Sequence, residues 1–70
     1  MISERLDALV GEMVNKGIQF EDAVHEFEKR FIAHALEDAA GNLGRAAERL
    51  GMHRNTLSRK VAEYRLRRAS

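Results

Sequence analysis

The chain has 70 residues with no cysteine and no proline, and its 12 Lys/Arg against 11 Asp/Glu give a net charge of +1. A chain of this length forms one domain with a small core, so oligomerisation is expected to supply further buried surface. The lack of cysteine excludes disulfides and thiolate metal sites, and apolar runs of only three or four residues exclude a membrane span.

Charge divides the chain into two unlike halves. Residues 1–41 hold four Lys/Arg and nine Asp/Glu, a net of −5, whereas residues 42–70 hold eight and two, a net of +6. The second half is therefore the part expected to approach a polyanion, with ordinary helix-surface charge as the alternative explanation. The N-terminus starts without a basic and then apolar signal, so a cytoplasmic location is expected.

Apolar residues recur at helical spacing and predict an all-α fold with four helices. The first covers residues 2–14 and ends at residues 15–17, and the second and longest runs from about Phe20 to Ala40. The third is a two-turn helix over residues 43–50, and the fourth begins near Arg54. Gly41 and Asn42 interrupt the apolar pattern. The glycine is suited to a left-handed helix cap, and the asparagine side chain can accept a hydrogen bond from the free amides that begin the third helix.

The segment from Ala46 to Leu57 has the spacing of a helix-turn-helix. Ala47 lets two helices cross closely, Gly51 supplies the backbone angle of the tight turn, and Met52 with Leu57 fills the corner between the helices. The remaining positions are then free to face DNA.

The last helix is predicted to be amphipathic. Leu57, Val61 and Tyr64 form its buried stripe at helical spacing. A basic, hydrogen-bonding face suited to base edges remains on the other side. The side chains expected there are Arg54, Thr56, Ser58, Arg59 and Lys60.

The stretch from Phe27 to Tyr64 resembles the Fis family, which includes the C-terminal domains of enhancer-binding regulators of the nitrogen regulator C type. The segments that carry the resemblance are Gly41-Asn42, Arg45-Ala46-Ala47, Leu50-Gly51, Arg54-Asn55-Thr56-Leu57 and Arg59-Lys60. They cover more than half of the chain and follow two preceding helices in the order that the family implies.

The resemblance implies a single Fis-like domain over residues 1–70, with dimerisation helices in residues 1–41 and the helix-turn-helix in residues 42–68. A homodimer would form through residues 2–40, which agrees with the apolar stripe of the second helix, too large for one subunit to cover. Binding of double-stranded DNA is expected to be weakly sequence-specific or sequence-tolerant, at bendable sites with a narrow central minor groove. Such a protein regulates transcription or shapes the nucleoid.

The resemblance also assigns roles to individual residues. Asn42 and Arg45 would contact phosphates at the start of the third helix, where free amides favour an anion. Arg54 would be the main reader of a guanine edge, and Arg59 would reach along the groove. Thr56 and Lys60 would anchor phosphates or touch neighbouring bases.

Three positions depart from the family pattern. Gly44 replaces a polar side chain and Ser58 a basic one, which should weaken DNA binding and flatten its salt dependence. His53 replaces the usual asparagine or serine, and it either caps the helix through a ring nitrogen or donates to a phosphate. The tail arginines Arg65, Arg67 and Arg68 either reach a flanking phosphate or interact only with the helix dipole.

Other functions are disfavoured. His25 and His34 have acidic neighbours at helical spacing (Glu21, Glu28 and Asp38), but scattered histidines in such a chain are usually surface residues, so no metal is expected. No catalytic cluster or phosphate loop is visible, so neither an enzyme nor a cofactor or small-molecule ligand is expected. The rival function is a helical dimeric protein-interaction module without DNA binding. The Met1 start favours a free-standing protein over the tail of a larger regulator.

Overall fold

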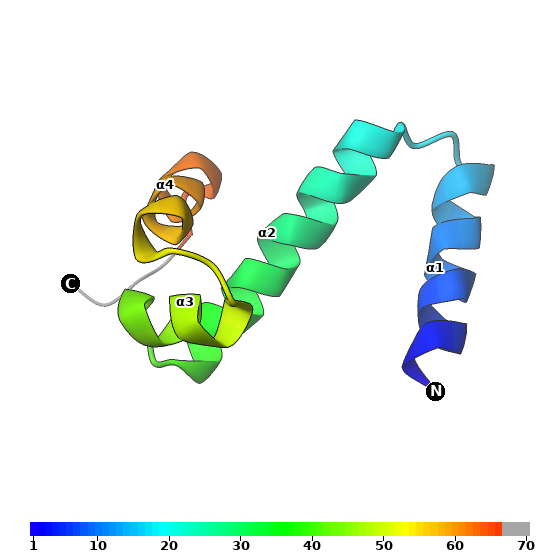
Figure 1. The fold of residues 1–70 in the computed structure, drawn as a ribbon. Helices are drawn as coiled ribbons and strands as arrows, with labels where there is room; N and C mark the ends of the chain where they lie inside the picture. The colour runs from blue at the N-terminus through cyan, green and yellow to red at the C-terminus, as the bar shows by residue number, and fades with distance from the viewer. Residues whose placement is uncertain (67–70) are drawn as a thin grey trace.

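Four α-helices make up the fold in the computed structural model, which describes residues 1–66 (Figure 1). They are α1 (Ile2–Asn15), α2 (Phe20–Asp38), α3 (Leu43–Leu50) and α4 (Arg54–Tyr64). The predicted all-α class and the order of the helices are confirmed. None of the helices within residues 1–66 has the length and apolar character that crossing a bilayer requires. The tail residues Arg67 and Arg68 lie outside the described residues.

The core lies where the C-terminal half of α2 meets α3 and α4. Ala46 and Leu57 are completely buried, and the small alanine side chains of α3 allow its backbone to pack closely against both neighbours. Tyr64 was predicted to be buried with the stripe of α4, but it is only half-buried because its hydroxyl reaches a polar partner on α2. The buried residues are Ile32, Leu36, Ala39, Ala46, Ala47, Leu57 and Val61.

Helix α2 ends at Asp38, two residues before the predicted end. Ala40 takes a left-handed conformation with φ of 53°, followed by Gly41 with φ of 79°, and the Gly41 amide donates to the Leu36 carbonyl at 2.8 Å. This pattern is a left-handed helix cap that satisfies the last carbonyls of the helix. The prediction that the helix reaches Ala40 is therefore wrong, because the left-handed cap already begins at that alanine.

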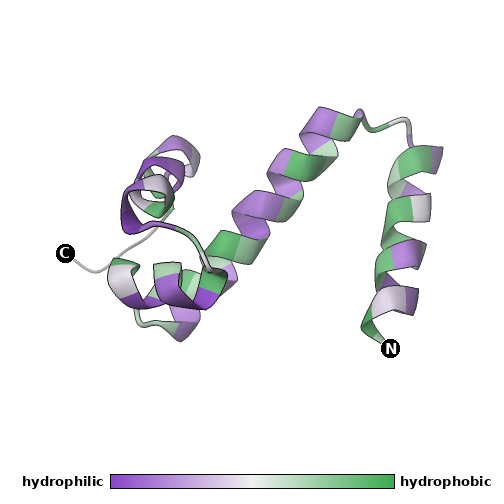
Figure 2. Ribbon diagram, viewed as in Figure 1, coloured by the Kyte–Doolittle hydropathy of each residue, from purple (hydrophilic) through white to green (hydrophobic). Residues whose placement is uncertain are grey.

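Helix α1 contributes no residue to the core and stands apart from α3 and α4 (Figure 1). Between α1 and the first half of α2 lies an apolar groove of about 590 Å³. Figure 2 shows hydrophobic stretches, coloured green, on both helices. The side chains of Phe20, Phe27 and Phe31 are 82%, 55% and 54% exposed. An apolar surface of this size lies uncovered in the single chain.

A matched pair of substitutions tests the close packing of α3. Ala46→Leu places three extra carbons at a completely buried position and is expected to destabilise the protein by about 1–3 kcal/mol. Ala62→Leu makes the same change at an exposed position of α4 and should stay within about 0.5 kcal/mol of the parent. Urea unfolding followed by circular dichroism measures both. Equal stability of the two variants would contradict this packing.

Candidate nucleic-acid interface

The turn between α3 and α4 is built on Gly51. Its φ of 69° lies in the left-handed region that favours glycine. The chain then folds back so that the Met52 amide donates to the Ala47 carbonyl at 3.0 Å. Met52 packs partly buried against the core that contains Leu57, as predicted from the spacing. These contacts fix the angle between α3 and α4, which a helix-turn-helix requires.

Both helices of this unit begin with a side-chain cap. Asn42 Oδ1 accepts a hydrogen bond from the Arg45 amide at 3.0 Å, as predicted. His53 Nδ1 accepts from the Asn55 amide at 3.0 Å, so of the two roles predicted for His53 the structure shows the cap. A capping side chain satisfies one of the free amides of the first turn. The amides that remain keep the positive end of the helix dipole available to an anion.

Three exposed arginines surround the helix-turn-helix. They are Arg45 in the first turn of α3, Arg54 at the start of α4, and Arg59 in its middle. Within residues 1–66 none of the three guanidinium groups forms an ion pair or a side-chain hydrogen bond. Thr56 is half-buried beside them. The described part of the unit therefore presents unpaired positive charge around α4.

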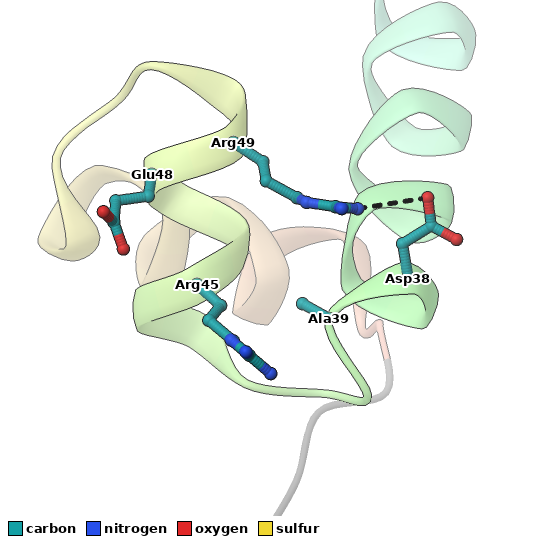
Figure 3. Close-up of a pocket in the computed structure, with 5 residues that line it drawn as sticks. All are labelled: Asp38, Ala39, Arg45, Glu48 and Arg49. Atoms are coloured by element: carbon teal, nitrogen blue, oxygen red, sulfur yellow. Dashed lines mark hydrogen bonds and ion pairs between the residues drawn. The ribbon is translucent and has the colours of Figure 1, made fainter.

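Arg49 behaves differently from Arg45 on the same helix. Its Nη1 lies 3.3 Å from Asp38 Oδ2 at the end of α2, and Figure 3 shows this side chain spanning the two helices. Arg45, one turn earlier, extends toward the side of Ala39 (Figure 3), and its guanidinium has no partner among residues 1–66. Both members of the Arg49–Asp38 pair are well exposed, so the pair contributes little to stability.

Lys60 faces α2, against the prediction that it lies on the outer face of α4. Its Nζ donates to Glu28 Oε1 at 2.9 Å, and only 27% of its side chain is exposed. The Tyr64 hydroxyl donates to the same oxygen at 2.8 Å. Lys60 turns toward α2 because the half-buried Glu28 carboxylate requires hydrogen-bond donors. Lys60 and Tyr64, one helical turn apart on α4, supply them.

The protonation states agree with this geometry. The hydrogen bond from Lys60, and after it the one from Tyr64, hold the pKa of Glu28 below its ordinary value. Burial and the hydrogen bond to Glu28 raise the pKa of Tyr64 to about 12. Near neutral pH the carboxylate is therefore ionised and the phenol protonated, which is the pairing that both hydrogen bonds require.

Glu28 and the Tyr64 hydroxyl were not recognised as polar partners from the sequence. The sequence pattern indicates Glu28 only as a helical neighbour of His25 in a disfavoured metal site. In the structure the His25 ring instead meets the Tyr64 ring edge-on, with centroids 6.4 Å apart. Among residues 1–66 no group of three His, Asp or Glu side chains is placed to hold a metal ion.

At Gly44, one of the three departures from the family pattern, the structure shows whether a side chain would fit. A Cβ added at this position would meet Asn42 Oδ1 at 3.5 Å, an ordinary contact. The backbone therefore has no need of glycine here. Ser58 is half-buried on α4.

Comparison with known proteins agrees with this geometry. The family model for bacterial regulatory proteins of the Fis family matches residues 23–64, which include all of α3 and α4 and most of α2. A protein of Xylella fastidiosa (strain 9a5c) named "Putative Fis-like DNA-binding protein" is 44% identical over 41 residues. These residues are 59% of this chain and 46% of that protein, so the chain spans less than half of its relative's length. No solved structure matches the chain significantly.

The cap at Asn42 is testable by substitution. Asn42→Ala removes the acceptor for the Arg45 amide and is expected to lower the free energy of unfolding by about 1 kcal/mol. Asn42→Ser keeps a capping oxygen and should retain most of the stability. Thermal unfolding followed by circular dichroism measures both variants. An alanine variant as stable as the serine variant would show that the cap is unimportant.

Proposed function

Because the chain belongs to the Fis family of bacterial regulatory proteins, we propose that it binds double-stranded DNA as a homodimer. The observation that carries the proposal is the set of three unpaired arginines on a capped helix-turn-helix. Such a unit places its second helix in the major groove while its first helix crosses the backbone. Here α4 is the reading helix, and α3 is the positioning helix.

Phosphate contacts are assigned to the start of α3 and to α4. Arg45 and the Asn42 amide group lie at the N-terminal end of α3, where the helix dipole adds to the attraction of an anion. Thr56 and Arg59 serve the same purpose from α4. His53 shapes the start of α4 through its cap. We assign the other edge of its ring to a backbone phosphate of the DNA. These contacts set the register of the protein on the duplex.

Base reading is assigned to Arg54. It lies in the first turn of α4, the end of a recognition helix that enters the groove, and a guanidinium matches the O6 and N7 acceptors of guanine. One such reader per subunit gives weak sequence preference, so the deformability of the DNA contributes much of the selectivity. This behaviour suits a regulator of transcription or a protein that shapes the nucleoid.

The partner that we assign to the apolar groove is a second copy of the chain. In one subunit α1 contains no buried residue. The ring centroids of Phe27 and Phe31 lie 5.4 Å apart, and both residues stay about half-exposed. A self-complementary pair of α1–α2 faces would bury both apolar surfaces around a two-fold axis. The acidic half of the chain would then form the dimer, and the two basic units would face the DNA.

DNA binding is tested by fluorescence anisotropy of a labelled duplex of about 27 base pairs across a range of salt concentrations. The wild type is expected to bind with an affinity that falls linearly in log salt. Arg54→Ala should weaken binding to a preferred duplex by about 1–3 kcal/mol and reduce sequence preference. Arg5→Ala, at an exposed arginine of α1, is the matched control and should bind like the wild type.

Two results would contradict the proposal, the first in its function and the second in the role of Arg54 alone. An absence of binding even at low salt would favour the protein-interaction module instead. An Arg54→Ala protein that keeps its affinity and its preference would remove Arg54 from base reading, while leaving DNA binding in place.

Dimerisation is tested by sedimentation at micromolar concentration. The wild type is expected to sediment as a dimer. Phe27→Asp puts a charge into the apolar face and should yield monomers, because an unpaired charge is costly to bury. Lys29→Asp makes a larger charge change at an exposed position two residues away on α2 and should leave the dimer intact. A monomeric wild type would overturn the assignment of the groove.

A further inference from the structure

We propose that Glu28 is a positioning residue for DNA recognition, which fixes α4 on α2 through Lys60 and Tyr64 and withholds the Lys60 ammonium from the DNA. The inference rests on the DNA binding proposed above. It assigns a role to an acidic residue of α2 and changes the role expected for Lys60.

The geometry is a two-point attachment. Glu28 Oε1 accepts from Lys60 Nζ at 2.9 Å and from the Tyr64 hydroxyl at 2.8 Å. The two donors lie four residues apart on α4, on the same face of the helix. Holding both of them from one oxygen limits rotation of α4 about its axis as well as its tilt against α2. A single surface ion pair would limit neither.

The surroundings favour a persistent attachment. The side chains of Glu28 and Lys60 are 31% and 27% exposed, far less than in the other ion pairs of residues 1–66. The His25 ring covers Tyr64 edge-on, and Glu26 and Glu63 add negative charge near the phenol. Partly desolvated, charge-assisted hydrogen bonds of this kind are stronger than exposed ones.

The attachment joins two functional parts of the molecule. Glu28 directly follows Phe27, which lies on the apolar face assigned to the dimer, whereas Lys60 and Tyr64 belong to the reading helix. In a dimer that binds two half-sites, the orientation of each reading helix against the dimer helices sets the spacing that fits successive turns of DNA. Glu28 is therefore placed to determine which half-site spacing the dimer accepts.

The Glu28–Lys60 ion pair also lowers the sequence-independent attraction of the protein to DNA phosphates. A lysine that neutralises a phosphate adds affinity that carries no sequence information. With Lys60 held by Glu28, the described part of α4 keeps Arg54 and Arg59 as its unpaired basic side chains. A larger share of the binding then depends on base contacts and on DNA shape.

The first test compares salt dependences on one duplex of about 27 base pairs. Lys60→Met should leave the slope of log affinity against log salt unchanged. Arg59→Met, next to it on α4, should reduce the magnitude of the slope by about 0.9 for each phosphate that the variant no longer neutralises. If Lys60→Met reduces the slope as Arg59→Met does, Lys60 leaves Glu28 for a phosphate, and the proposal is overturned.

The second test releases the lysine. Glu28→Gln keeps an acceptor for the Tyr64 hydroxyl but removes the charge that holds Lys60. The slope should steepen by about 0.9 per released lysine, and the affinity ratio between a preferred and a scrambled duplex should fall. Adding Lys60→Met to Glu28→Gln should restore the wild-type slope. A Glu28 with a merely structural role would change thermal stability and leave the slope as it was.

A third measurement separates this proposal from the proposed function. Carbon NMR of the free protein follows the titration of the Glu28 carboxyl. Its pKa should lie below the ordinary value of 4.5 in the wild type and should be higher in Lys60→Met. A wild type that binds no duplex would defeat the function, while the titration still reports on the attachment. Titration of Glu28 at the same pH in both proteins would show that Lys60 does not hold it, and would overturn the proposal.

Discussion

Ile32 and Leu36, near the C-terminal end of α2, are the two buried residues of the longest helix, and the rest of the described structure is arranged around them. Helices α3 and α4 pack against this end and close a small core. Within residues 1–66, the other end of α2 has only α1 beside it, and α1 contains no buried residue. This uncovered end of α2 is the surface that the proposed homodimer would bury.

This one-sided core also explains the importance of capping in the helix-turn-helix. Helices of two and three turns are marginal in isolation, and little apolar area is available to stabilise α3 and α4. Asn42, Gly51 and His53 satisfy or redirect backbone groups at the ends of these helices with local contacts alone. The geometry of the helix-turn-helix therefore depends less on core size than on correct helix ends.

Features governed by local chemistry could be predicted from the sequence. The four helices, the left-handed Gly51 and the Asn42 cap follow from residues a few positions apart. The end of α2 was misplaced because alanine rarely adopts a left-handed conformation, and the cap at Ala40 is determined by how the chain must turn toward α3. Glu28 and Lys60 are 32 residues apart in the sequence, and the periodic spacing of apolar residues does not predict contacts between such distant residues. Sequence patterns show which face of α4 is polar, but not which polar side chain is drawn back to α2.

The division of charge along the chain acquires a structural meaning from that pairing. The acidic first half would repel DNA and the basic second half would attract it. An assembly that keeps the two halves apart therefore reduces the repulsion between its acidic residues and the DNA. Glu28 is an acidic residue of the first half that reaches into the second, and it does so where a lysine is already turned inward. Its charge is neutralised locally, at the cost of one cation that DNA would otherwise attract. Within residues 1–66, the unpaired arginines of α3 and α4 are Arg45, Arg54 and Arg59, and they lie where a helix-turn-helix meets phosphates and bases. If the chain binds DNA as proposed, its selectivity would depend as much on the positive charge that the fold neutralises as on the charge that it exposes.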